Sequence, residues 1–279
     1  AEHVAEVRKL CEAPDSVVTW IPLGCPKARY LSGKVLNRIR FFRRALDNMS
    51  CRRLIVSAAD VATIHAVTII RRFGILKFND IDIVLHAVLA ELWGWQPRNP
   101  LYKIDRLPFA LQCAPSDISY IVLDHHIARE LQVRKPNLNG RLRVLPHPIT
   151  NHDWKVNQSD CDLIPPVHFG FLGAATLDKG FDVFLDIAAE VKSKLGDKVI
   201  FSAIGPLRMP VKESRLWPLK RRPTAVGMPR TAFLQAALEI DYALLPLGPG
   251  YAYIASGSVL DAIALGKPIV APKLPGFAD

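Results

Sequence analysis

Residues 167–196 read VHFGFLGAATLDKGFDVFLDIAAEVKSKLG, and this stretch decides the fold class. A short apolar run over residues 167–172 passes through a loop of small residues into a helical pattern over residues 181–195, which Gly196 is suited to end. The stretch therefore predicts a strand, a loop and a helix of a parallel α/β sheet. The apolar residues at helical spacing predict the buried face of the helix: Phe181, Phe184, Leu185, Ala188 and Val191.

The same alternation of short apolar runs and helical patterns extends along the chain in both directions. Downstream, we expect strands at 199–204, 242–245 and 269–271 and helices at 230–238 and 259–265, the last with a core face of Val259, Leu260 and Ile263. Upstream, we expect strands at 17–21, 54–57, 81–86, 120–123 and 143–145 and helices at 34–49, 61–73, 101–111 and 125–131. Repeated units of this kind are typical of parallel sheets covered by helices.

Two such sets of elements predict an α/β protein with two Rossmann-like βαβ domains that face each other across a cleft. The domains cover residues 1–150 and 167–279, and a polar linker at 151–166 ends in Pro165-Pro166. Ligands of open α/β sheets bind at the carboxyl ends of the strands, so we expect the site in the cleft. The chain begins without Met inside a helix-like run, and we interpret it as a fragment truncated at both ends.

The formal net charge of +10 is concentrated early in the chain. Residues 34–49 form a basic amphipathic pattern with an apolar stripe of Val35, Leu36, Ile39, Phe42, Leu46 and Met49. Such a helix suits an anionic membrane surface or an anionic acceptor, but it equally suits a solvated helix whose stripe packs on the core. We expect no nucleic-acid partner, because the sequence lacks a zinc-finger spacing, an RNA-recognition signature and a basic stripe interleaved with aromatic residues.

Cysteine usage and hydropathy predict a cytoplasmic protein. The five cysteines have no C-x-x-C spacing and are typical of free thiols in a reducing compartment. We find no signal peptide, and the most apolar stretch, residues 54–70, carries Asp60 and His65 and is too short to span a bilayer. Peripheral attachment to the inner face of the membrane through the basic helix at 34–49 is the alternative.

The loop before the helix at 181–195 is the first candidate site. It runs from Gly173 to Asp178, and Lys179 follows it directly. Backbone N–H groups of a small-residue loop and a lysine ammonium together can bind a diphosphate. A solvated βα turn is the alternative, because many such turns carry a glycine and a lysine.

The second candidate site lies in residues 248–268, GPGYAYIASGSVLDAIALGKP. Ser256 or Ser258 is suited to cap the helix that follows, and Gly257 permits close approach of a ligand to the backbone. The free N–H groups of the first helical turn favour an anion. Asp261, one turn in, either accepts the hydroxyls of a ribose or merely complements the helix dipole.

The order and spacing of these blocks resemble the donor domain of GT-B glycosyltransferases of the family 4 type, also called glycosyl transferases group 1. The resemblance covers about residues 167–273 and includes VGMPRTAFLQAALEIDYALLPL at 226–247. More loosely, DIDIVLH at 80–86, DISYIVLDHHIARELQ at 117–132 and RLRVLPHPI at 141–149 resemble the acceptor domain of that family. The resemblance implies a retaining, metal-independent enzyme whose co-substrate is a nucleoside diphosphate sugar, with no further cofactor.

The resemblance also implies roles for individual residues on the phosphate side of the donor. Lys179 matches the lysine that binds the donor diphosphate, beside the loop that begins at Gly173, and we assign it a catalytic role. Ser256, Gly257 and Ser258 match the helix start that also contacts the phosphates.

On the side of the nucleoside and the sugar, Asp261 matches the second acid of the family's E-x7-E motif, which binds the ribose. Gly227 and Met228 match a loop that brackets the base. His86 resembles the histidine of the acceptor domain that faces the donor sugar, and we assign it a catalytic role as well.

Two positions depart from the family pattern. The first glutamate of the motif is replaced by Tyr253, which we count among the donor-binding residues although it cannot supply a carboxylate. The arginine that usually precedes Lys179 by five positions is Ala174. Another cation would have to compensate, because a charge-assisted hydrogen bond contributes about 1.5–3 kcal/mol. The candidates, whose positions the sequence does not determine, are Arg208, Arg230 and the run 220–222.

We therefore expect a glycosyltransferase that moves a sugar from a nucleoside diphosphate sugar to a saccharide or lipid-linked acceptor, as in polysaccharide biosynthesis. Two alternatives stay open. One is a nucleotide-sugar epimerase of the same fold, which would need an acid pair at the sugar. The other is a catalytically degenerate, glycosyltransferase-like scaffold.

Overall fold

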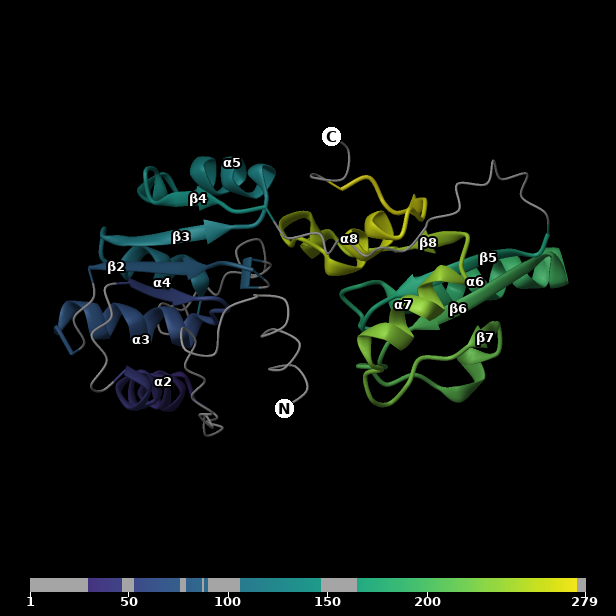
Figure 1. Cartoon of the computed structure of the whole chain (residues 1–279), viewed down its shortest axis with the longest axis horizontal. Helices are drawn as coiled ribbons and strands as arrows, with labels where there is room; N and C mark the ends of the chain where they lie inside the picture. Colours follow the sequence, from purple (N-terminus) through teal and green to yellow (C-terminus); the bar gives the residue numbers. More distant parts are fainter. Residues whose placement is uncertain are drawn as a thin grey trace.

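The structure of the chain, a computed structural model, describes residues 30–46, 53–75, 79–86, 88–89, 106–146 and 165–274. Within these ranges the chain forms two all-parallel sheets with helices around them. In Figure 1 the strands of the first sheet run to the right and those of the second run to the left, so their carboxyl ends face the middle of the molecule. The predicted α/β fold with two facing sheets is confirmed. The predicted strand at 17–21 and residues 151–164 of the predicted linker lie outside the described residues.

The first sheet has the strand order β1-β2-β3-β4. Its strands are β1 (Arg53–Val56), β2 (Asp80–Val84), β3 (Ile118–Val122) and β4 (Leu142–Val144). Its helices are α2 (Leu31–Leu46), α3 (Val61–Arg72), α4 (Leu107–Cys113) and α5 (His125–Arg134), with a 3-10 turn at Pro136–Leu138. Each of these strands and helices was predicted. Helix α4 shares residues 107–111 with the predicted helix at 101–111, and residues 101–105 of that prediction lie outside the described residues.

The basic helix α2 packs on the protein core. Phe42 is buried in the hydrophobic core of the first sheet, and Ile39 and Leu46 pack against that core beside α3. Three residues of the stripe thus pack on the core, which favours the interpretation of α2 as a solvated helix over the core. Leu36, in contrast, is 46% exposed, and Met49 lies outside the described residues. No helix in the described ranges is long and apolar enough to cross a membrane.

The second sheet has the strand order β7-β6-β5-β8-β9. Its strands are β5 (Val167–Leu172), β6 (Val199–Ile204), β7 (Leu219–Arg221), β8 (Tyr242–Leu244) and β9 (Ile269–Val270). Its helices are α6 (Phe181–Leu195), α7 (Arg230–Leu238) and α8 (Gly257–Ala264), with 3-10 turns at Gly196–Lys198, Glu213–Leu216 and Pro249–Tyr253. The bounds of β5, β6, α6 and α7 agree with the prediction to the residue, whereas β7 has no apolar pattern and was not predicted.

The predicted core faces of the helices hold for α6 and only partly for α8. On α6 the first four predicted residues are buried, and rings at 171, 181, 184 and 201 lie 5.1–6.0 Å apart. On α8 the prediction for Ile263 is wrong, because its side chain is 52% exposed while Ala262 is fully buried. The helix begins two residues before the predicted start, and small side chains at Ser258 and Ala262 face the protein instead.

Candidate functional site

Two glycines bring the ends of the central strands of the second sheet together. Gly173 follows β5 with a φ of +89°, and Gly205 follows β6 with a φ of +140°. A Cβ on Gly205 would lie 2.2 Å from the carbonyl oxygen of Gly173. Both backbone conformations are ones that side chains rarely adopt, so this close approach requires glycine on both strands.

A cavity of about 310 Å³ opens at these strand ends. We call it the second-sheet cavity, and it is lined by Gly173, Gly205, Pro206, Gly227, Met228, Arg230 and Phe233. Three predicted donor-binding residues, Gly173, Gly227 and Met228, therefore line the same cavity although they lie far apart in the sequence.

Lys179 and Ser258 meet above Gly173. The Nζ of Lys179 donates to the Oγ of Ser258 at 2.7 Å. A Cβ built on Gly173 would lie 2.7 Å from that Oγ and 2.8 Å from that Nζ, so the missing side chain makes room for both. Burial lowers the pKa of the Lys179 ammonium, and the negative charge of Asp261 opposes this shift. The structure thus joins three predicted phosphate-binding residues.

The turn into α6 fixes the position of Lys179. Gly180 is the N-cap of α6 and has a φ of +71°. A Cβ on Gly180 would lie 1.9 Å from the carbonyl oxygen of Pro246, which follows β8. The backbone after Lys179 is therefore held closely against a neighbouring strand end.

Asp261 lies beside Arg230, a residue whose position the sequence did not determine. The Nη2 of Arg230 donates to the Oδ1 of Asp261 at 2.5 Å. The Arg230 guanidinium also lies over the ring of Phe233, 5.3 Å from its centroid. Of the other candidate cations, Arg221 and Arg222 form ion pairs with Glu239 and Glu213 instead.

Ser256 is the N-cap of α8 by its backbone conformation, but its side chain makes no capping hydrogen bond. Its Oγ is buried and has no hydrogen-bond partner among the residues that the structure describes. Gly257 is open, since a Cβ there would meet nothing within 4 Å. Of the three predicted residues at this helix start, the structure joins only Ser258 to Lys179.

Tyr253 faces the first half of the molecule. Its ring stacks on His126 of α5 at a centroid distance of 6.3 Å and an interplanar angle of 16°. It also packs against the core of the first sheet. Tyr253 does not belong to the lining of the second-sheet cavity, so its place among the donor-binding residues stays a prediction.

A second cavity, of about 580 Å³, lies at the carboxyl ends of β1 and β2. We call it the first-sheet cavity, and it is lined by Arg38, Phe41, Phe42, Ile55, Val56, Ser57, Ala58, Ala59, Asp60, Thr63, His86 and Val88. The structure thus places His86 in a different cavity from the predicted donor-binding glycines.

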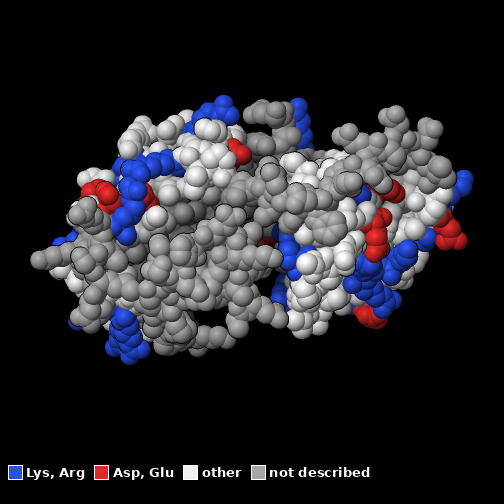
Figure 2. All heavy atoms as spheres, in the orientation of Figure 1, with Lys and Arg blue, Asp and Glu red and all other residues white. Residues whose placement is uncertain are grey.

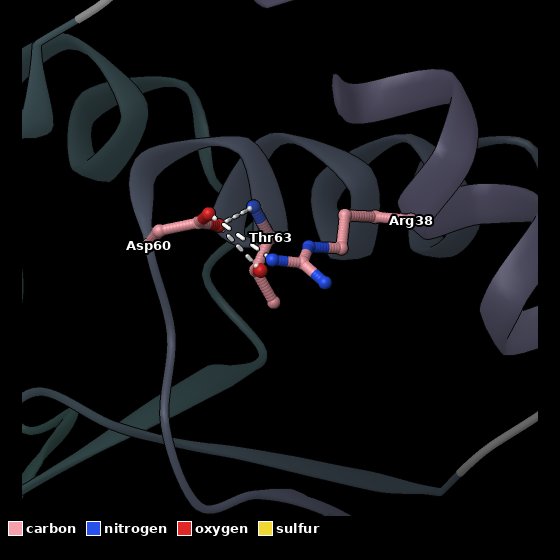
Figure 3. Close-up of polar contacts among 3 residues, drawn as sticks. All are labelled: Arg38, Asp60 and Thr63. Carbon is pink, nitrogen blue, oxygen red and sulfur yellow. Dashed lines mark hydrogen bonds and ion pairs between the residues drawn. The ribbon is translucent and has the colours of Figure 1, made fainter. Parts of the chain in front are cut away.

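Arg38, Asp60 and Thr63 form the polar side of the first-sheet cavity, and Figure 3 shows Arg38 reaching from α2 to the start of α3. The Oδ1 of Asp60 accepts from the N and Oγ1 of Thr63 at 2.7 and 2.6 Å, and Arg38 Nη2 lies 3.3 Å from Oδ2. Burial raises the pKa of Asp60, but these hydrogen bonds and the Arg38 charge outweigh it and hold the pKa below 3.8. We did not predict this cluster from the sequence, although an Asp three residues before a Thr and an apolar run is a capping signal.

Charges of both signs are interspersed on the face of the molecule in Figure 2, with Lys and Arg atoms also at the inner edge of the second half. Among the described residues, no group of three His, Cys, Asp or Glu side chains is arranged to hold a metal ion.

Comparisons with known proteins complete this description. No family profile and no curated protein sequence matches the chain. The structure is similar to WaaG, a glycosyltransferase involved in lipopolysaccharide biosynthesis (TM-score 0.60, 14% identity, covering 92% of this chain and 69% of that one). It is similar to sucrose-phosphate synthase from Thermosynechococcus elongatus (0.61, 13%, 92% and 66%). It is also similar to a putative UDP-N-acetylglucosamine 2-epimerase from Listeria monocytogenes (0.52, 10%, 96% and 68%).

At 10–14% identity these similarities show a shared fold. The chain therefore has the two-sheet α/β architecture of GT-B enzymes, as predicted. It spans about two thirds of each of these three chains, and 64% and 44% of two others that it matches. The family 4 type stays a prediction.

Proposed function

We propose that the protein is a glycosyltransferase that uses a nucleoside diphosphate sugar and binds the diphosphate in the second-sheet cavity. The observation that carries the proposal is the contact of Lys179 with Ser258 at Gly173. Gly173 and Arg230 line the cavity, whereas Lys179 and Ser258 lie next to its lining. This arrangement combines cations, a hydroxyl and close access to the backbone, which together suit phosphate groups. The fold shared with WaaG supports a transferase.

The chemistry of these residues suits departure of a nucleoside diphosphate. When the bond between the sugar and the diphosphate breaks, negative charge grows on the diphosphate oxygen. The Lys179 ammonium would stabilise that charge, and the N–H groups at the start of α8 would assist. We propose a retaining, metal-independent transfer in which most of the catalysis comes from positioning and from this electrostatic stabilisation.

The first-sheet cavity is our proposed site for the acceptor, a saccharide or a lipid-linked sugar. It combines the rings of Phe41 and Phe42 with the polar groups of Asp60 and His86. Aromatic rings pack on sugar faces or lipid, and a carboxylate accepts hydrogen bonds from hydroxyls. His86 would orient the attacking hydroxyl or the donor sugar.

A nucleotide-sugar epimerase of the same fold is the second candidate, because the Listeria protein shares this architecture. Such an enzyme needs acids at the sugar, and the aromatic Tyr253 stands where the resemblance places one, packed against the first half. A glycosyltransferase-like scaffold without catalytic activity is the third candidate.

Incubating the protein with UDP-, GDP-, ADP- and dTDP-sugars and a panel of saccharide and lipid-linked acceptors separates these candidates. Release of free nucleoside diphosphate together with a glycosylated product supports transfer. A changed sugar that is still attached to its nucleotide would instead identify an epimerase, and failure of every nucleotide to bind would identify a scaffold.

We further propose that the protein is cytoplasmic, with contact to anionic membranes as an option that rests on charge alone. Since Ile39, Phe42 and Leu46 of α2 pack on the core, contact with lipid headgroups would be made by exposed cations such as Arg43 and Arg44. Co-sedimentation with anionic vesicles that is lost on Arg43→Glu/Arg44→Glu would support contact; equal sedimentation of both proteins would refute it.

A further inference from the structure

The groups around Gly173, which lines the second-sheet cavity, have an unexpected charge arrangement for an anion site. Lys179 donates to the neutral Ser258, and Asp261 places a negative charge near that ammonium. A diphosphate carries more than one negative charge, so Lys179 alone would not balance both the ligand and Asp261. A second cation is needed on electrostatic grounds.

Arg230 has the position that this second cation requires. It is the first residue of α7 and lines the cavity together with Gly173. Its guanidinium is fixed from two sides, by Asp261 at 2.5 Å and by the ring of Phe233 below it. A guanidinium has several N–H donors in a planar fork, and the hydrogen bond to Asp261 uses one of its nitrogens, Nη2. The side chain is 34% exposed, so solvent and ligands can reach it.

Asp261 is correspondingly placed to hold Arg230. Its side chain is only 19% exposed, and its Oδ1 is occupied by the guanidinium. Without Arg230 the charge of this carboxylate would be opposed by the Lys179 ammonium, which would leave less positive charge for an anionic ligand. The role of Asp261 is then to orient the cation, and direct binding of the ribose hydroxyls is not required.

We propose that Arg230 is the second diphosphate-binding cation of this protein and that Asp261 is its positioning residue. This inference rests on the proposed function, since it names how the same cavity balances the charge of its ligand. It assigns to α7 the cation that the loop lacks at Ala174.

Calorimetry with two ligands tests the inference: the tightest-binding of UDP, GDP, ADP and dTDP, and inorganic pyrophosphate. We expect Arg230→Met to weaken binding of both ligands by about 10- to 100-fold. Arg221→Met is the matched control, because Arg221 also pairs with an acid but lies outside the cavity lining, and it should leave both affinities unchanged. Arg230→Lys keeps the charge and should retain more affinity than Arg230→Met.

The double variant decides the role of Asp261 by the sign of its effect. If Asp261 only orients Arg230, then adding Asp261→Asn to Arg230→Met removes that carboxylate, and both ligands should bind more tightly than to Arg230→Met alone. If Asp261 binds the ribose, the same addition weakens the nucleotide further and spares pyrophosphate, which would overturn that part of the proposal.

The outcomes also separate this inference from the proposed function. Nucleotide binding that is unchanged in Arg230→Met but lost in Lys179→Met would refute the inference and leave the proposed function intact. A wild-type protein that binds neither a nucleoside diphosphate nor pyrophosphate would refute both. Thermal melting of each variant identifies any loss of affinity that comes from unfolding.

Discussion

The two cavities of this molecule share their place in the fold and differ in the residues that line them. Each lies at the carboxyl ends of a parallel sheet, and each is lined by an arginine that pairs with an aspartate. Three of the seven lining residues of the second-sheet cavity are glycines, whereas the first-sheet cavity is lined by none. One architecture therefore offers exposed backbone for an anion on one side and rings and methyl groups for a larger ligand on the other.

The aspartates that pair with these two arginines, Asp60 and Asp261, also differ in the partners that hold them. Asp60 is the N-cap of α3 and is held by two groups of Thr63 in addition to Arg38, so it serves the helix as well as the cavity. Asp261 lies inside α8, and Arg230 is the partner that the structure shows for its carboxylate. The first pair is built into the fold, whereas the second is arranged around a space that can receive a ligand.

The largest difference between the two halves should be in the loss of unfolding free energy when a glycine with a left-handed backbone conformation is replaced by alanine. Gly180 and Gly140 have φ values of +71° and +76°, but a Cβ on Gly180 would meet Pro246 O at 1.9 Å and one on Gly140 would meet nothing within 4 Å. Gly180→Ala should lower the free energy of unfolding by about 3 kcal/mol or more, and Gly140→Ala by only about 1–2 kcal/mol. Urea denaturation measures both free energies, and equal losses would contradict the close approach of Gly180 to the carbonyl oxygen of Pro246.

Removing the buried ammonium should have the next largest effect. Lys179→Met should weaken nucleoside diphosphate binding by about 10- to 150-fold, the equivalent of the 1.5–3 kcal/mol of a charged hydrogen bond. Lys212→Met removes an exposed lysine of the same half and should change the affinity little. If calorimetry gives the same affinity for both variants, the second-sheet cavity does not bind the diphosphate.

The pH dependence of nucleotide binding should also reflect the charge of Lys179. Because burial holds the pKa of Lys179 below 10.5, the ammonium loses its proton at a lower pH than an exposed lysine does. Nucleotide affinity should therefore be present at neutral pH and fall as the pH rises through this lowered pKa. Lys179→Arg keeps its charge in this range and should show a flat profile. A wild-type affinity that is constant up to pH 10.5 would contradict this.

The smallest effect should come from the first-sheet pair. Asp60→Ala removes the cap of α3 and should cost about 1 kcal/mol of unfolding free energy, without changing nucleotide affinity. Since the folded pKa of Asp60 lies below 3.8, its contribution is present above that pH and is lost as the pH falls below it. Urea midpoints for wild type and Asp60→Ala should therefore converge in acid. A change in nucleotide affinity would instead link the two cavities.

The sequence predicted the fold well, because the spacing of apolar residues within each segment indicates whether that segment forms a strand or a helix. The strand, loop and helix at 167–196 needed only their own spacing, and the structure reproduces their bounds. That Gly173, Lys179 and Ser258 belong to one site was implied by the family resemblance, and the structure brings their atoms together.

Side-chain contacts between segments that lie far apart in the sequence could not be predicted. The pairing of Arg230 with Asp261 joins the start of α7 to the middle of α8. The packing of Tyr253 on His126 joins the two halves. Periodicity carries no information on either contact, and the short strand β7 has too few apolar residues to form a pattern.

A crystal structure with the tightest-binding nucleoside diphosphate tests the central claim most directly. We predict that both phosphates lie above Gly173, with Lys179 Nζ and the Arg230 guanidinium within hydrogen-bond distance of their oxygens. A diphosphate bound outside the second-sheet cavity, for example beside Arg38 in the first-sheet cavity, would contradict the account.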